Sequence, residues 1–364
     1  MNVLVAAGGT GGHVNPALAV AEVLDERGDS VVFLGGTRGM ERDLVGRFGF
    51  DIELIDIEGL DRSRPTSLPR VAGKAAVAVS RARHIIRERA IDVVLGMGGY
   101  VSLPAALGAG SARIPLVIHE QNIVLGLANR LSRPIAASVA VSWERTLEAV
   151  GDKGVLTGDP VTASIARFDR DALRPRALKS LGLSARRKTV LFFGGSLGAR
   201  TINEAAIGLR SLWAGRSDVQ IVHIHGSGGA HGDTLGGRKL IYRPVEYLEG
   251  MADAYAVADI AVCRGGATTV AELTAVGLGS IIVPYPHHRD RQQELHASVL
   301  TDAGAARTIA DRELTTERLE TELDALMNKE TLGALGAAAR ILARPDAAVM
   351  LADLVVRSAP LGDD

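Results

Sequence analysis

Short apolar segments rich in valine and isoleucine recur along the chain, separated by amphipathic stretches of helical length. In the first half they lie at residues 2–7, 30–34, 52–57, 92–95, 115–119 and 138–141. Buried strands that alternate with helices form parallel sheets covered on both faces, because each crossover helix packs an apolar face on the sheet. The pattern therefore predicts an α/β fold with a doubly wound parallel sheet.

The alternating pattern stops and then starts again in the second half. A polar, arginine-rich stretch occupies residues 167–188, shortly after the sequence Gly-Asp-Pro at 158–160. Apolar segments then return at residues 189–193, 219–224, 239–242, 260–263, 280–283 and 307–309. The length of 364 residues is also more than one domain usually needs. We expect two Rossmann-like domains, residues 1–160 and 161–340, followed by a C-terminal helix and tail at 341–364.

Glycine-rich loops follow the first predicted strand of each half. Residues 8–13 read GGTGGH and residues 194–200 read GGSLGAR. Backbone N–H groups and the helix dipole favour an anion at such a loop. Doubly wound sheets bind ligands beyond the carboxyl ends of their strands, so two facing domains would enclose a cleft. A glycine turn that binds nothing is the alternative, and neither a Walker A loop nor the dinucleotide-binding spacing is present.

A histidine, His13, lies where the first glycine loop passes into a predicted helix. The ordinary pKa of a histidine, about 6.5, suits proton transfer near neutral pH. A general base is one interpretation. A capping or phosphate-contacting histidine that moves no proton is the other, and the residue types leave both open.

The segment RGGATTVAE at residues 264–272 repeats the strand, glycine and helix arrangement in the second half. Arg264 adds a cation, Thr268 and Thr269 add hydroxyls, and Glu272 lies one turn further along the helix. A helix N-terminus with an arginine suits a diphosphate, and a carboxylate can accept hydrogen bonds from ribose hydroxyls. An ordinary first-turn acid is the alternative for Glu272.

Amide side chains follow two further predicted strands, Asn122 in HEQN and Gln292 with Gln293 in DRQQE. Each amide offers donors and an acceptor to sugar hydroxyls, although solvated helix starts are equally common. The histidines near residue 290 lack the carboxylates and cysteines of a metal site, so we expect no metal.

Composition excludes several classes of protein. The 41 basic residues nearly balance the 42 acidic ones and only 4% of residues are aromatic, which disfavours nucleic-acid binding. The single cysteine, Cys263, excludes a disulfide framework and fits a reducing compartment. The N-terminus does not resemble a secretory signal, and Pro104 with several glycines interrupts the longest uncharged run, residues 93–112. We expect a soluble or peripheral protein.

Basic residues concentrate in one amphipathic segment, residues 60–89, which contains eight basic residues and two acidic ones. Such a helix could lie against anionic lipid headgroups or an acidic ligand. A crossover helix that packs its apolar stripe on the sheet and solvates its charges is the alternative. The candidate docking residues are Arg70, Lys74, Arg81 and Arg83.

Six motifs in order resemble the MurG family of peptidoglycan glycosyltransferases. They are GGTGGH (8–13), GMGGYV (96–101), HEQN (119–122), GGS (194–196), CRGGA (263–267) and DRQQ (290–293). The resemblance spans about residues 2–344 and implies a GT-B fold, two Rossmann-like domains facing a central cleft. It also implies metal-independent, inverting transfer of N-acetylglucosamine (GlcNAc) from UDP-GlcNAc to lipid I, giving lipid II without a cofactor.

The resemblance assigns roles to particular residues. Glu272 would hold the ribose, the backbone at Leu248 would read the uracil, and His13 would act as the base or orient the acceptor diphosphate. The implied donor-binding residues are Thr10, Gly11, Gly12, Asn122, Ser196, Leu248, Arg264, Gly265, Gly266, Ala267, Thr268, Thr269, Glu272, Gln292 and Gln293. Two departures from the family pattern are Thr162, where an arginine is usual, and Gly265, where a serine is frequent.

The lipid acceptor implied by the resemblance changes the interpretation of the basic segment, because the enzyme must then dock on a membrane. We expect a peripheral protein on the cytoplasmic face of the inner membrane, with a cell-wall synthesis complex as a possible partner. A UDP-GlcNAc epimerase of the same fold and a non-catalytic sugar-nucleotide sensor are the competing hypotheses.

Overall fold

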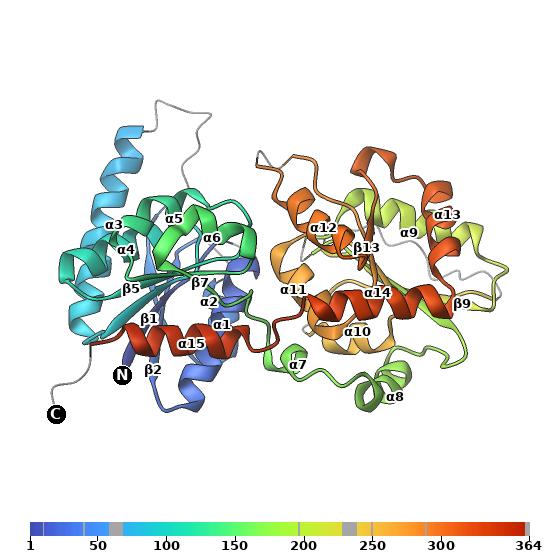
Figure 1. The fold of residues 1–364 in the computed structure, drawn as a ribbon, viewed down its shortest axis with the longest axis horizontal. Helices are drawn as coiled ribbons and strands as arrows, with labels where there is room; N and C mark the ends of the chain where they lie inside the picture. Colours follow the sequence, from blue (N-terminus) through green and yellow to red (C-terminus); the bar gives the residue numbers. More distant parts are fainter. Residues whose placement is uncertain are drawn as a thin grey trace. The chain divides into compact units, whose positions relative to one another are not determined.

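The computed structural model describes residues 1–9, 11–38, 41–57, 68–195, 197–227, 239–248, 250–287 and 290–360. They form two compact units, Met1–Thr162 with Pro345–Asp364, and Ala163–Arg344. Each unit has its own parallel sheet with helices on both faces (Figure 1). The chain thus has the predicted α/β architecture.

The first unit is built on seven parallel strands. In chain order they are β1 (Asn2–Ala6), β2 (Ser30–Gly36), β3 (Asp51–Ile55), β4 (Val93–Gly96), β5 (Leu116–Glu120), β6 (Ser138–Val141) and β7 (Gly154–Leu156). Their order in the sheet is β3-β2-β1-β4-β5-β6-β7. Its helices are α1 (Gly11–Glu26), α2 (Glu41–Arg47), α3 (Leu68–Glu88), α4 (Ser102–Ala112), α5 (Leu127–Ser132), α6 (Glu144–Val150) and α15 (Ala347–Ser358). Strand β7 was not predicted, because three half-buried residues carry no strong apolar pattern.

The second unit contains six parallel strands. They are β8 (Lys188–Phe193), β9 (Val219–Ile224), β10 (Ile241–Val245), β11 (Ile260–Cys263), β12 (Ser280–Ile282) and β13 (Ala306–Thr308), in the order β10-β9-β8-β11-β12-β13. The helices are α7 (Ala163–Ala166), α8 (Arg170–Ser180), α9 (Arg200–Leu212), α10 (Ala252–Val257), α11 (Ala267–Val276), α12 (Gln292–Asp302), α13 (Thr316–Leu326) and α14 (Lys329–Ile341). The predicted strand at 239–242 begins two residues later, at Ile241.

The final helix α15 joins the first unit, whereas the sequence suggested a separate C-terminal segment. It lies beside α1 (Figure 1), and its Leu351 and Val355 share one core with Val5 and Leu18. Alternate residues of each central strand face opposite cores, so Leu4 packs on the α3 and α4 side. The chain therefore passes from the first unit to the second after Thr162 and returns to the first unit at Pro345, where α15 completes the apolar cover of the first sheet.

Each sheet reverses its strand order at one place, between β1 and β4 in the first unit and between β8 and β11 in the second. Ligands bind at such switch points, because neighbouring loops turn to opposite faces and leave a crevice. The glycine motifs follow these four strands. The topology therefore places them where a ligand site is expected.

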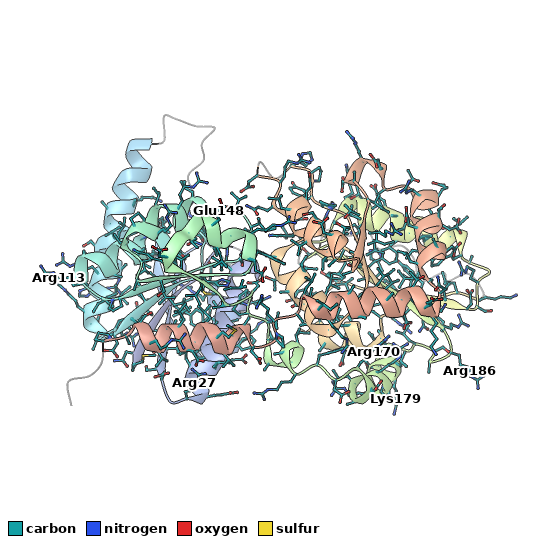
Figure 2. The ribbon with its side chains drawn as sticks, viewed as in Figure 1. Arg27, Arg113, Glu148, Arg170, Lys179 and Arg186 are labelled. Carbon is teal, nitrogen blue, oxygen red and sulfur yellow. The ribbon has the colours of Figure 1, made fainter. Side chains whose placement is uncertain are left out.

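Arginines of α8 bind the C-terminal end of α10, where the chain enters β11. Arg170 (Figure 2) donates to the carbonyl oxygens of Ala256 and Ala258, at the end of α10, and pairs with Asp259 at 2.7 Å. A cation at a helix C-terminus is favourable because unpaired carbonyls and the dipole make that end negative. This contact holds α10, which carries Tyr255.

Within the described ranges, no helix has the length and apolar character to span a bilayer.

Candidate functional site

Glycines allow two loops to touch at the first switch point. A Cβ at Gly99 would lie 2.3 Å from the carbonyl oxygen of Gly8, closer than any side chain permits. Gly9 and Gly99 also have φ values of +97° and +78°, which residues other than glycine rarely adopt. The loops after β1 and β4 therefore need glycine for both space and backbone conformation.

The imidazole of His13 packs on the loop after β4. A Cβ at Gly98 would lie 3.1 Å from its Cε1, and the ring hydrogen-bonds to the backbone of Met97. Nδ1 lies 2.9 Å from Nε2 of Gln121. An amide nitrogen only donates, so Nδ1 accepts and the ring is neutral. Burial lowers the pKa of His13, which favours the same neutral form.

The HEQN motif divides into interior and loop residues. Glu120, 2% exposed, accepts hydrogen bonds from the backbone N–H of Asn122 (2.9 Å) and its Nδ2 (3.1 Å) through Oε1. Oε2 accepts from the backbone of Gly126 at 2.7 Å and from Nδ2 of Asn129 at 3.0 Å. Burial raises the pKa of Glu120 and these bonds oppose that rise. The carboxylate holds the loop that carries Asn122.

His119 lies in the interior of the first unit. Its Nε2 is 3.0 Å from the carbonyl oxygen of Gly158, and burial lowers its pKa to about 4. Its side chain joins β5 to the chain leaving β7. This residue supports the motif rather than offering a group to a ligand.

A buried acid that the sequence reasoning missed, Glu41, supports the first glycine loop. Its side chain is fully buried, and Oε1 accepts from the backbone N–H of Gly9 at 2.7 Å and from the Tyr100 hydroxyl at 3.3 Å. Tyr100 belongs to the GMGGYV motif, but no pattern in the sequence marks Glu41. Only folding brings α2 against the loop.

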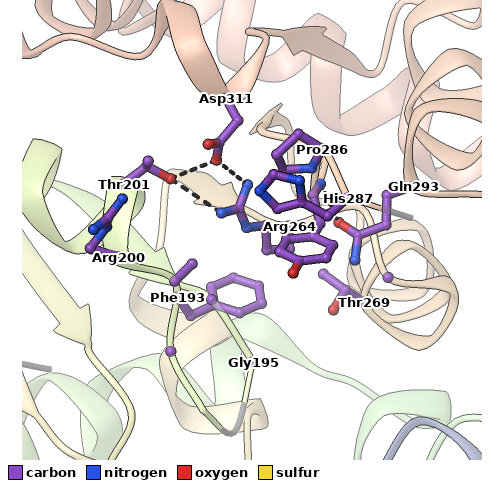
Figure 3. A pocket seen from close by; sticks show the side chains of 15 residues that line it. Phe193, Gly195, Arg200, Thr201, Arg264, Thr269, Pro286, His287, Gln293 and Asp311 are labelled. Carbon is purple, nitrogen blue, oxygen red and sulfur yellow. Dashed lines mark hydrogen bonds and ion pairs between the residues drawn. The ribbon is translucent and has the colours of Figure 1, made fainter. Parts of the chain in front are cut away.

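A pocket of about 380 Å³ lies at the switch point of the second unit (Figure 3). It is lined by Phe193, Gly194, Gly195, Gly198, Ala199, Arg200, Thr201, Arg264, Gly266, Thr269, Tyr285, Pro286, His287, Gln293 and Asp311. Helices α9 and α11 both begin beside this pocket, at Arg200 and Ala267. Two helix N-termini and glycine backbone make the pocket suitable for an anion.

Arg264 lines the pocket, but its charge is already paired. Nη1 lies 2.5 Å from Asp311, and Nη2 donates to the Thr201 hydroxyl at 3.2 Å (Figure 3). Nη1 also donates to the carbonyls of Val283 and Pro284 at 3.0 and 3.2 Å. The guanidinium therefore ties β11, β12 and α9 together, and the sequence could not reveal the Asp311 partner.

Gln293 enters the pocket wall with a defined orientation. Its Oε1 accepts from the backbone N–H groups of Gly265 (3.2 Å) and Tyr285 (2.9 Å). Its Nε2 makes no hydrogen bond within the described part of the chain and is left to donate to a ligand. Gln292 is 5% exposed and not part of the lining. A Cβ at Gly265 would meet the Gln293 carbonyl at 2.6 Å, so the serine frequent in the family does not fit here.

Glu272 lies on α11 and is partly exposed. Its Oε2 accepts from the hydroxyl of Tyr255 at 2.7 Å, and burial raises its pKa to about 7. Gly266 caps α11, Ala267 and Thr268 form its first turn, and Leu248 follows β10. Gly11 and Gly12 begin α1. Thr10 and Ser196 lie outside the described residues.

The basic helix α3 pairs several of its charges with the neighbouring strand. Arg81 meets Glu53 at 3.2 Å, and Lys74 meets Asp56, which follows the strand, at 3.1 Å. The Arg83 Nε is buried without a hydrogen bond among the described residues, and the side chain of Arg70 is not described. Some of the local positive charge is therefore neutralised within the unit.

Comparisons with known proteins cover almost the whole chain. Models of the glycosyltransferase family 28 N-terminal and C-terminal domains match residues 3–141 and 189–349. A *Corynebacterium efficiens* protein named UDP-N-acetylglucosamine--N-acetylmuramyl-(pentapeptide) pyrophosphoryl-undecaprenol N-acetylglucosamine transferase is 39% identical, over 99% of this chain and 98% of its own. A *Saccharopolyspora erythraea* protein of the same name is 41% identical, over 88% and 84%.

Solved structures agree with the sequence relatives. *Acinetobacter baumannii* MurG has a TM-score of 0.75 and 30% identity, over 98% of this chain and 99% of its own. The UDP-GlcNAc 2-epimerase of *Neisseria meningitidis* has a TM-score of 0.68 over 98% of this chain and all of its own, but at 14% identity it shows the shared fold alone. This chain therefore belongs to the MurG family within glycosyltransferase family 28.

Proposed function

We propose that this protein transfers GlcNAc from UDP-GlcNAc to undecaprenyl-pyrophosphoryl N-acetylmuramyl-pentapeptide, lipid I, and so forms lipid II and UDP. The observation that carries the proposal is 39% identity over nearly the full length to a relative whose name states this transfer. The pocket of the second unit supports it, because its helix N-termini and glycine backbone suit a diphosphate.

The donor would bind through backbone and amide groups of the second unit. Gly194, Gly195 and the N-terminus of α11 would face the diphosphate, where negative charge grows as UDP departs. Gln293 would donate from Nε2 to the donor, since its oxygen is already occupied. Arg264 would act mainly by shaping this wall, because Asp311 neutralises its charge.

Further donor contacts follow from the family motifs. Glu272 would accept from the ribose, and the backbone at Leu248 would meet the uracil. The other residues proposed to contact the donor are Thr10, Gly11, Gly12, Asn122, Ser196, Gly265, Gly266, Ala267, Thr268, Thr269 and Gln292. No cofactor enters this scheme.

The first unit would supply the acceptor chemistry. In inversion, the 4-hydroxyl of the muramyl sugar attacks the anomeric carbon opposite the departing UDP, and the hydroxyl proton must leave. His13 is neutral, as a base must be, and its basic nitrogen is Nδ1. Gln121 donates to this atom in the structure, so its amide must turn aside as the acceptor hydroxyl approaches. We propose His13 as the base, with orientation of the acceptor diphosphate as its alternative role.

A membrane-linked acceptor requires a docking face. We infer peripheral binding to the cytoplasmic side of the membrane through α3, with Arg70, Lys74, Arg81 and Arg83 near the headgroups. Arg81 is exposed and its ion pair with Glu53 is a surface pair, which costs little to open. Reversal of Arg81 and Arg83 to glutamate should reduce binding to anionic liposomes.

Transfer of radiolabelled GlcNAc to a lipid I analogue tests the proposed function directly. A labelled lipid product that requires both substrates supports it. A folded protein that turns over UDP-GlcNAc with no acceptor present would instead be an epimerase, and one that binds the donor without turnover would be a sensor. Either result contradicts the transfer.

A further inference from the structure

Tyr255 is a buried tyrosine that none of the motifs contains. It lies on α10, is 1% exposed, and donates its hydroxyl to Oε2 of Glu272 at 2.7 Å. Its ring meets Phe193 edge to face, with centroids 6.0 Å apart. Phe193 ends β8 and lines the pocket. Two elements therefore fix the direction of the hydroxyl before any ligand binds.

The contact leaves half of the Glu272 carboxylate available. Oε2 is held by Tyr255, while Oε1 makes no hydrogen bond within the described ranges. Glu272 is partly exposed, so a ligand hydroxyl can reach it. A glutamate has three rotatable bonds, and holding one oxygen removes most of its freedom. A fixed carboxylate loses less entropy on binding, which raises affinity without a new contact.

We propose that Tyr255 is a positioning residue for the nucleoside part of the donor: its hydroxyl holds Glu272 so that Oε1 faces a ribose hydroxyl. This inference rests on the proposed function, which assigns Glu272 to the ribose. The ligand class is a ribonucleoside diphosphate, and the selectivity at stake is ribose over 2′-deoxyribose. A bound nucleoside covers Oε1, and an acceptor that is covered but left without its hydroxyl partner disfavours the deoxy ligand.

The protonation of Glu272 gives a second readout. The titratable groups that interact with it are Tyr255 from α10 and Cys263 from β11, while no charged side chain of α7, α12 or α14 interacts with it in the described part of the chain. Burial raises its pKa to about 7, and the Tyr255 bond opposes the rise. Loss of the hydroxyl should raise the pKa further, so UDP affinity should weaken at a higher pH than in the natural protein.

The test uses Tyr255→Phe in the full-length protein, with UDP and 2′-deoxy-UDP as ligands in titration calorimetry from pH 6 to 9. Tyr242→Phe is the matched control, because its hydroxyl lies 2.7 Å from Nδ1 of His223 on β9 and does not contact Glu272. We expect Tyr255→Phe to weaken UDP binding about three- to tenfold, the effect of one hydrogen bond. The preference for UDP over 2′-deoxy-UDP should shrink and the pH midpoint should rise.

Two control variants accompany Tyr255→Phe, and two results would overturn the inference. Tyr242→Phe should keep the natural preference and midpoint, and Glu272→Gln should lose most of the preference. If Tyr255→Phe lowers only the melting temperature and keeps both readouts, its role is structural and the inference is wrong. If Glu272→Gln keeps the preference, Glu272 does not hold the ribose and the inference fails with that assignment. If the unsubstituted protein prefers UDP over 2′-deoxy-UDP but forms no lipid product in the transfer assay, only the proposed transfer is refuted.

Discussion

Glu120 offers the sharpest test of how the structure holds the loop that carries Asn122. Its carboxylate is 2% exposed and accepts four hydrogen bonds, two at each oxygen. Glu120→Gln keeps the shape but replaces one oxygen with an NH₂ group. Two N–H donors then lose their acceptor and face another donor. The loop from Gln121 to Gly126 should therefore loosen.

The cost can be estimated from these contacts. Hydrogen bonds to a charged group contribute about 1.5–3 kcal/mol each, so two lost bonds amount to about 3–6 kcal/mol. Loop donors can turn to water, and the substitution also removes a buried charge whose desolvation raises the pKa of Glu120. Both effects reduce the loss, and we expect about 3 kcal/mol. For a unit of this size the melting temperature should fall by about 6–12 °C.

Scanning calorimetry of the full chain checks the estimate in the transition of the first unit. Glu148→Gln is the matched control, because Glu148 is exposed on α6 of the same unit (Figure 2). We also expect kcat to fall in Glu120→Gln, since Asn122 loses its support. If both variants melt like the natural protein, the Glu120 carboxylate does not hold the loop and the reasoning is refuted.

Three further predictions concern other parts of the molecule. Asp311→Asn frees the charge of Arg264, so UDP should bind several-fold more tightly in calorimetry while stability falls by about 1–2 kcal/mol; unchanged affinity would contradict the pairing. His119 and His223 have a pKa of about 4, so the unfolded state binds more protons below about pH 6.5. Stability should drop by about 1 kcal/mol per pH unit for each histidine down to pH 4, measured by urea unfolding; a flat profile would refute this. Arg291 has a φ of +49°, and Arg291→Gly should raise the urea midpoint by relieving about 1 kcal/mol of strain; a lower midpoint would show that its side chain matters more.

Much of the architecture could be predicted because it depends on local patterns. Apolar segments such as Val3 to Val5 specify buried parallel strands by themselves, and glycines between a strand and a helix mark ligand loops. The candidate Arg264 was found this way, and Gln293 was found as an amide that follows a predicted strand. Both line the pocket of the second unit. Strand β7 was missed because its three residues are half-buried.

Pairings between distant residues were beyond the sequence. Asp311 lies 47 positions from Arg264 and neutralises it, and Glu41 reaches Gly9 across 32 positions. Such contacts depend on which loops the sheet order brings together, and no periodicity encodes that order. The same reason hid Tyr255, an ordinary core tyrosine by pattern.

The sequence by itself therefore determined most of the strands and helices, the division into two sheets and the glycine loops, because burial and backbone conformation act over a few neighbouring residues. Only the tertiary structure decided which charges remain available to a ligand. In the folded chain α15 packs in the first unit, and Arg264 forms an ion pair with Asp311. The tertiary structure also left one oxygen of Glu272 unbonded by the described chain. Hydrogen bonds and ion pairs are short-range in space but not along the chain, so only folding selects them.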